Sequence, residues 1–108
     1  MRDDQLTELL ELYAVELQDR FHAVPRQFED RPGLAGYARL VAQLDHVLWM
    51  IAQMHKGMQP GVNAWDGKKL NRWLGFIQGV LWMAGAYTID ELRQQTRVFA
   101  QREAPREA

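Results

Sequence analysis

The stretch from Lys68 to Gly85, KKLNRWLGFIQGVLWMAG, most strongly constrains the fold of this chain. Placed on a helix, it carries apolar side chains around most of its circumference, which is typical of a helix buried among others. Gly75 and Gly79 stand four residues apart within it, and each glycine costs about 1 kcal/mol relative to alanine inside a helix. That cost indicates a close backbone approach, within one subunit or between two. We therefore expect a buried central helix over residues 67–85.

Three further segments carry apolar residues at steps of three and four, which places those residues on one face of a helix. No segment alternates apolar and polar residues as a half-buried strand would. A chain of 108 residues fits one domain. The sequence therefore predicts one all-α domain over residues 1–108, a small four-helix bundle with helices at about 4–23, 32–56, 67–85 and 89–101, a loop at 57–66 and a frayed tail at 102–108.

Breakers and capping residues set the ends of these helices. Pro25 ends the first helix, because the residue before a proline is pushed out of the helical region. Asp30 and Asp66 are suited to cap the second and third helices with their carboxylates. Thr88 and Glu91 stand three residues apart, the spacing of a capping box at the start of the last helix.

The composition excludes several kinds of chemistry. The chain has no cysteine and no serine, so these two nucleophiles and a thiolate zinc site are excluded. His46 and His55 are nine residues apart and fall on opposite faces of a helix, which disfavours a metal site. We expect no cofactor and no enzymatic activity. An enzyme that uses His46 or Asp45 as a base is the least favoured alternative.

Charge is unevenly distributed along the chain, although the formal net charge is only −1. Residues 1–30 contain eight acids and three bases, which gives −5, and residues 31–108 contain six acids and ten bases, which gives +4. The acidic first helix is therefore suited to meet a basic surface of the later helices, of a second subunit or of another protein. The basic excess is too small for a general nucleic-acid binder.

The location of the protein is predicted from what the sequence lacks. Arg72 and Gln78 interrupt the longest apolar run, so we expect no membrane span. The N-terminus, MRDDQLTELL, is acidic and lacks an apolar signal core. We therefore expect a cytoplasmic protein.

A cluster of polar and aromatic residues lies outside the main apolar stripes of the second and third helices. A helix start that combines free amides, a positive dipole end and cations is suited to a phosphate or carboxylate. Tryptophans offer a flat face for a base. Lysines at a helix start are also common as ordinary solvated residues, and that interpretation stays open. The residues that we predict to bind an anionic ligand are His46, Trp49, Lys69, Arg72, Trp73 and Gln78.

Three questions about this cluster are open from the sequence. Trp65, in the turn-rich loop, is either a plug at the end of the bundle or a stacking surface at the mouth of a site. Gln78 is flanked by apolar residues, so its amide needs a partner inside the subunit or across a subunit interface. Arg72 and His46 would have to face one cavity to bind one ligand.

Three motifs follow one another between residues 44 and 97: LDHVLWMIAQM at 44–54, RWLGFIQGVL at 72–81 and YTIDEL at 87–92. They resemble small uncharacterised proteins that tailed bacteriophages and prophages encode. The resemblance implies a phage protein expressed in the bacterial cytoplasm. Small phage accessory proteins commonly modulate the host, including its immune systems, which is an association and not a mechanism.

These observations support two functions of different classes. The first is a non-enzymatic phage accessory protein that sequesters an anionic, nucleotide-like ligand, such as a signal of host defence. The second is an inhibitor or adaptor that binds a host or phage protein through the acidic first helix or an exposed helical face. The second and third helices also offer more apolar surface than the thin last helix covers, so we predict a homodimer.

Overall fold

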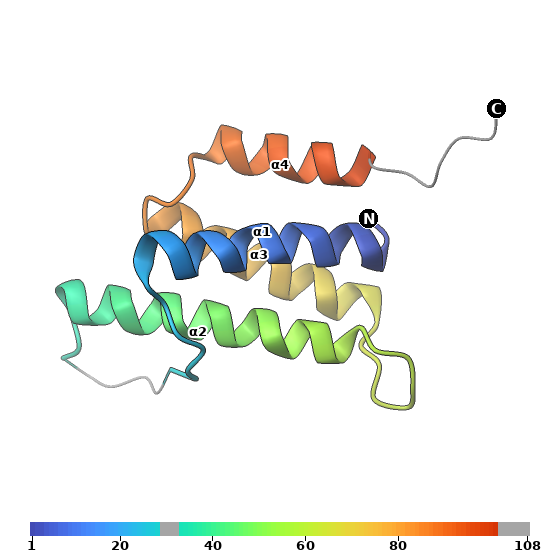
Figure 1. Cartoon of the computed structure of the whole chain (residues 1–108), viewed down its shortest axis with the longest axis horizontal. Coiled ribbons are helices and arrows are strands. Elements are labelled where there is room, and N and C mark those ends of the chain that lie inside the picture. Colours follow the sequence, from blue (N-terminus) through green and yellow to red (C-terminus); the bar gives the residue numbers. More distant parts are fainter. Residues whose placement is uncertain (29–32, 102–108) are drawn as a thin grey trace.

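The computed structural model describes residues 1–28 and 33–101, and every regular element within them is an α-helix (Figure 1). The helices are α1 (Asp3–Phe21), α2 (Gly36–Gly57), α3 (Gly67–Met83) and α4 (Ile89–Gln101). Each helix runs antiparallel to the one before it (Figure 1). The predicted all-α fold with four helices is confirmed.

The four helices form a ring in which α1 and α3 each pack against both α2 and α4. α1 and α3 therefore lie diagonally across the bundle, α1 in front and α3 behind in Figure 1. The pair α3 and α4 packs least closely of the four neighbouring pairs. This arrangement turns the outer faces of α1 and α3 in opposite directions.

The core is built from the apolar stripes that the helical spacing predicts, because each helix contributes one face to the centre of the ring. Burying a large apolar side chain is worth roughly 1.5–3 kcal/mol, so this shared surface holds the four helices together. The largest fully buried side chains are Tyr13, Leu9, Leu10, Leu17, Met54, Ile77, Leu81 and Val47.

The first helix ends at Phe21, earlier than predicted. His22 adopts the left-handed conformation with φ of 55°, and the Ala23 N–H donates a hydrogen bond of 3.0 Å to the Leu17 carbonyl. These contacts satisfy the carbonyls of the last turn before the chain reaches Pro25. Pro25 therefore follows the end of the helix and does not cause it.

The second helix begins at Gly36, four residues later than the predicted start at residue 32. Gly33 and Gly36 take positive φ values of 84° and 64°, so the chain turns through left-handed conformations as it enters the helix. The cap predicted at Asp30 lies outside the described residues. The frayed tail predicted at 102–108 lies outside them as well.

The capping predictions for the last two helices are confirmed. The Asp66 carboxylate accepts a hydrogen bond of 2.8 Å from the Lys69 N–H at the start of α3. At the start of α4 the Thr88 hydroxyl accepts from the Glu91 N–H at 3.1 Å, and the Glu91 carboxylate accepts from the Thr88 N–H at 2.9 Å. α3 itself ends at Met83, two residues before its predicted end.

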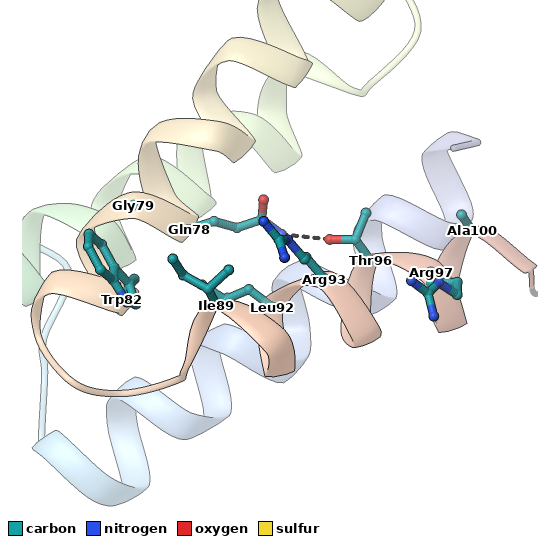
Figure 2. Close-up of a pocket in the computed structure, with 9 residues that line it drawn as sticks. All are labelled: Gln78, Gly79, Trp82, Ile89, Leu92, Arg93, Thr96, Arg97 and Ala100. Carbon is teal, nitrogen blue, oxygen red and sulfur yellow. Dashed lines mark hydrogen bonds between the residues drawn. The ribbon is translucent and has the colours of Figure 1, made fainter.

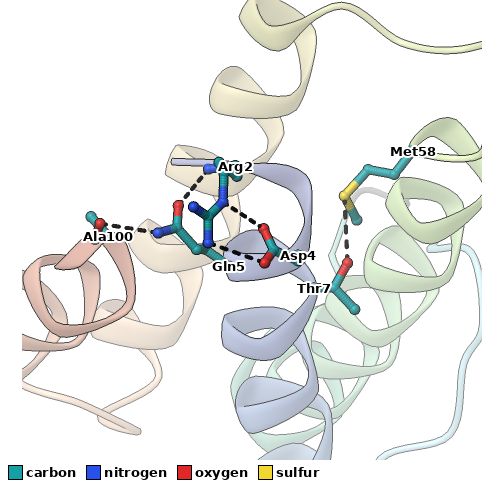
Figure 3. Close-up of polar contacts among 6 residues, drawn as sticks. All are labelled: Arg2, Asp4, Gln5, Thr7, Met58 and Ala100. Carbon is teal, nitrogen blue, oxygen red and sulfur yellow. Dashed lines mark hydrogen bonds and ion pairs between the residues drawn. The ribbon is translucent and has the colours of Figure 1, made fainter. Parts of the chain in front are cut away.

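Two polar side chains near the N-terminus tie α1 to neighbouring segments (Figure 3). The Gln5 amide nitrogen donates a hydrogen bond of 3.1 Å to the Ala100 carbonyl of α4, while its oxygen accepts from the Arg2 N–H. The Thr7 hydroxyl lies 3.8 Å from the Met58 sulfur, just after α2. These contacts fix the N-terminal end of α1 between its two neighbours.

Candidate functional site

The connection that follows α1 is held against α2 by two adjacent side chains, Asp45 and His46. The Asp45 carboxylate accepts a hydrogen bond of 3.1 Å from the Val24 N–H, and His46 Nδ1 accepts one of 3.0 Å from the Phe28 N–H. Neutral His46 therefore carries its proton on Nε2. Burial lowers the pKa of His46, which favours this neutral form. Both side chains thus position the connection.

His46 also begins a row of aromatic rings that crosses from α2 to α3. Its ring stacks on Trp49 with 5.2 Å between centroids. Trp49 lies 6.3 Å from Trp73, and Trp73 lies 4.5 Å from Trp65. The three indoles are partly buried. The row therefore brings together three of the predicted ligand-binding residues and adds Trp65 to them.

Trp65 packs on the backbone at the end of α2. The backbone N–H of Trp65 donates a hydrogen bond of 2.8 Å to the Gly57 carbonyl. A Cβ built on Gly57 would lie 2.6 Å from Cγ of the indole, so this position has no room for a side chain. The loop tryptophan thus closes the end of the bundle as a plug, and it also borders the aromatic row.

The cationic start of α3 is already engaged by groups of the chain itself. The Lys69 ammonium nitrogen lies 3.9 Å from the centroid of the Trp65 ring and 6.0 Å from that of Trp73. The Lys69 N–H donates to the Asp66 carboxylate, which takes a position that an external anion would use at a helix start. The predicted anion site is therefore partly filled in the free protein.

Arg72 and Gln78 lie apart from the aromatic row. Arg72 is exposed on the outer side of α3, and it is not among the residues that line the cavity of about 240 Å³ beside His46. The Gln78 amide donates hydrogen bonds of 3.1 Å to the Tyr13 hydroxyl and 2.9 Å to the Thr96 hydroxyl. Gln78 therefore has its partners inside the subunit, where it joins α3 to α1 and α4.

The side of α3 that faces away from the core is largely apolar and exposed, so the prediction of a buried central helix is wrong for this side. Phe76 is 57% exposed, Trp82 47% and Met83 76%. A Cβ built on Gly75 or Gly79 would meet no atom within 4 Å, so neither glycine allows a close approach within the subunit. These five residues fall on one side of the helix and are called the outer α3 face from here on.

A groove borders each side of the outer α3 face. Figure 2 shows the groove toward α4, a cavity of about 530 Å³ that combines the apolar residues Trp82, Ile89 and Leu92 with Arg93 and Arg97. The groove opens here because α3 and α4 pack loosely. The groove toward α2 has a volume of about 480 Å³, and its lining includes Leu40, Gln43, Phe76, Val80 and Met83.

The outer side of α1 is mainly acidic, although Leu12 and Val15 are also exposed on this helix. Ion pairs such as Arg20 with Glu16 at 3.3 Å stay within α1, as Arg93 with Asp90 at 3.9 Å stays within α4. Neither of them joins α1 to a later helix. The exposed acids that we call the acidic α1 face are Asp4, Glu8, Glu11 and Asp19.

No family model matches the chain, and neither a curated protein nor a solved structure matches it. The resemblance to phage proteins therefore stays a prediction. Across residues 1–28 and 33–101, no helix has the length and apolar character that crossing a membrane requires. In the same part of the chain, no three acidic or histidine side chains gather where they could hold a metal ion.

Proposed function

We propose that this chain is a binding protein, an inhibitor or adaptor, whose outer α3 face receives an apolar surface of another polypeptide. The observation that carries the proposal is the exposure of Phe76, Trp82 and Met83 on one side of one helix. Contiguous apolar patches on soluble proteins mark interaction sites. Aromatic residues and methionine are also enriched in the cores of protein interfaces.

The relief of this surface supports the same proposal. Phe76 and Met83 stand seven residues apart, one above the other along the helix, and Gly79 leaves a gap between them. The grooves toward α2 and α4 run beside this ridge. Helices pack by placing the ridges of one into the grooves of the other, so the surface is suited to a helix of the partner.

A photo-crosslinking amino acid in place of Met83, in protein expressed in bacterial cells, tests the proposal. We expect covalent adducts with a polypeptide, because the side chain at this position is exposed on the outer α3 face. The matched control replaces Val62, which is fully exposed in the loop after α2. Equal and low adduct formation at both positions would contradict a binding role for the outer α3 face.

A second function is the capture of an anionic, nucleotide-like ligand by a phage accessory protein that counters host defence. The observation that favours it is the Lys69 ammonium 3.9 Å above the Trp65 ring, at the end of the aromatic row. An anion there would pair with Lys69 while its base stacks on an indole. Calorimetry against a nucleotide panel tests it, with Lys69→Ala and Arg72→Ala as variants. The absence of heat from the wild-type chain with every nucleotide would exclude this function for the panel.

A further inference from the structure

We infer that the polypeptide on the outer α3 face is a second copy of this chain, with its α3 antiparallel and Gly75 of one copy against Gly79 of the other. The inference rests on the proposed function, because it takes this face to be a protein-binding surface. It assigns the partner, the direction of the pairing and the register, and it gives the predicted homodimer a defined interface.

The side chains that flank the two glycines complement one another in this register. Three residues before Gly75 stands Arg72, and three residues after Gly79 stands Trp82. Antiparallel pairing of the glycines therefore brings Arg72 of each copy level with Trp82 of the other. A guanidinium over an indole contributes roughly 0.5–1 kcal/mol at an exposed site and more when it is desolvated. Two-fold symmetry forms this contact twice.

The charges at the two ends of α3 also favour the antiparallel direction. Lys68 and Lys69 lie in the first turn, which contains no acid, and the last turn contains no basic residue. Cations near the positive end of a helix dipole are unfavourable, whereas cations near the carbonyl end are favourable. Antiparallel pairing places the cationic start of each α3 near the carbonyl end of the other. A parallel pair would instead set Arg72 beside Arg72.

The glycines fit the same contact. Each costs about 1 kcal/mol in a helix, and neither is needed for packing within the subunit, where both face open space. A second α3 that crosses at Gly75 and Gly79 can bring its backbone close, as small residues at this spacing allow between paired helices. Phe76 of each copy then lies beside the crossing, level with Gln78 of the other copy and against the grooves that border this face.

Disulfide trapping tests the direction and register, because the natural chain contains no cysteine. The variants are Gly75→Cys and Gly79→Cys, one of them carrying a size tag. We expect the disulfide that joins one copy of each variant to form about tenfold faster than a disulfide that joins two copies of the same variant. The reason is that only opposed residues satisfy disulfide geometry. Residues 75 and 79 are separated by about 6 Å along the helix, which offsets like positions from one another. Val62→Cys, in the exposed loop, measures the rate of random collision.

The outcomes separate this inference from the proposed function. If disulfides between two copies of the same variant form faster than disulfides between the two different variants, the antiparallel register is overturned. Rates no higher than that of Val62→Cys would overturn self-pairing, unless the new side chains themselves separate the helices. The photo-crosslinker at Met83 resolves that case in a chain that keeps both glycines. An adduct of twice 12.6 kDa supports self-pairing. Adducts only with another polypeptide overturn it and leave the proposed function standing, and no adduct contradicts both.

Discussion

The diagonal helices α1 and α3 bury similar apolar stripes, yet their outer faces differ in kind. α1 exposes acids to solvent, with Glu8 and Glu11 on its outer side. α3 exposes Phe76 and Met83. A stripe that faces the core determines how the helix packs in the bundle, and both helices satisfy that requirement. The outer face determines what else the helix meets, and that of α3 exposes the larger apolar side chains, which are costly to leave in water.

The two helix starts show the same difference. Asp3 and Asp4 lie in the first turn of α1, where acids are favourable next to the positive end of the dipole. The first turn of α3 carries Lys68 and Lys69, and the acid at this helix start is the capping Asp66 before it. This balance of charge is less favourable than that of α1. We conclude that α1 is suited to face water and that α3 is suited to face a partner.

Neighbouring residues on α3 should separate the two roles most sharply. Ile77 is fully buried and Phe76 is more than half exposed. We expect Ile77→Ala to lower the free energy of unfolding by about 2–5 kcal/mol, because it leaves a cavity in the core. Phe76→Ala should change the stability of the monomer by less than about 1 kcal/mol and weaken self-association. Urea unfolding at low protein concentration measures the first effect. Equal losses from the two variants would show that the outer α3 face belongs to the core of the monomer.

Replacing Gly57 or Gly79 by alanine should change the free energy of unfolding in opposite directions. Gly57→Ala is expected to cost about 1–3 kcal/mol, because its Cβ would overlap the indole of Trp65. Gly79→Ala should stabilise the monomer by up to about 1 kcal/mol, because it adds helix propensity where no atom is near. In the same variant we expect weaker dimerisation. Thermal unfolding of both variants measures the two changes in stability, and light scattering measures dimerisation. A Gly79→Ala dimer tighter than the wild type would contradict a close helix crossing.

The connection before α2 should depend on pH through His46. Its pKa is lowered in the folded protein by burial, so as the pH falls the unfolded chain takes up the proton first. The stability that His46 contributes is therefore complete above about pH 6.5 and is lost as the pH falls through the folded pKa. Protonated His46 can no longer accept from the Phe28 N–H. At the lower pH we expect the Phe28 amide to be less protected relative to its intrinsic exchange rate. We expect a smaller pH dependence of this protection in His46→Asn, which keeps an acceptor.

The acidic α1 face should give the smallest effect on stability. Glu8→Gln with Glu11→Gln removes two exposed charges, and we expect a change in the free energy of unfolding within about 0.5 kcal/mol and no change in dimer mass. If this face docks a basic partner, as the alternative proposal has it, the same variant loses that partner in a pull-down. A dimer that dissociates on this substitution would place the self-association surface on α1 and reverse the comparison.

The helices could be predicted from the sequence to within a few residues, because helical spacing and capping are local. The caps at Asp66 and Thr88 are examples of such local signals. The ends at Phe21 and Gly36 could not be placed as well, because each depends on where the backbone turns left-handed. Gly33 and Gly36 permit such a turn but do not determine at which residue the helix starts. His22 is the clearest case, since a histidine at φ of 55° carries no sequence signal.

The candidate site could be predicted only in part for a similar reason. His46, Trp49 and Trp73 were expected to be close, and helical spacing with neighbouring helices brings them together. The partners of Gln78 lie 65 and 18 residues away in the chain, so no local pattern identifies them. The outer α3 face was missed because periodicity counts apolar residues without showing which of them other helices cover. The excess of apolar surface on the second and third helices, from which we predicted a dimer, was the sequence signal that could have indicated this face.

The mass of the wild-type protein in solution tests the central claim most directly. We expect light scattering at micromolar concentration to give twice the 12.6 kDa of one chain. The double variant Phe76→Glu with Met83→Glu should give 12.6 kDa with an unchanged helical spectrum, because both side chains are exposed in the monomer. Val15→Glu places a single glutamate on the outer side of α1 and should remain a dimer. A wild-type mass of 12.6 kDa, or a double variant that stays dimeric, would contradict the assignment of the outer α3 face as the contact between two copies.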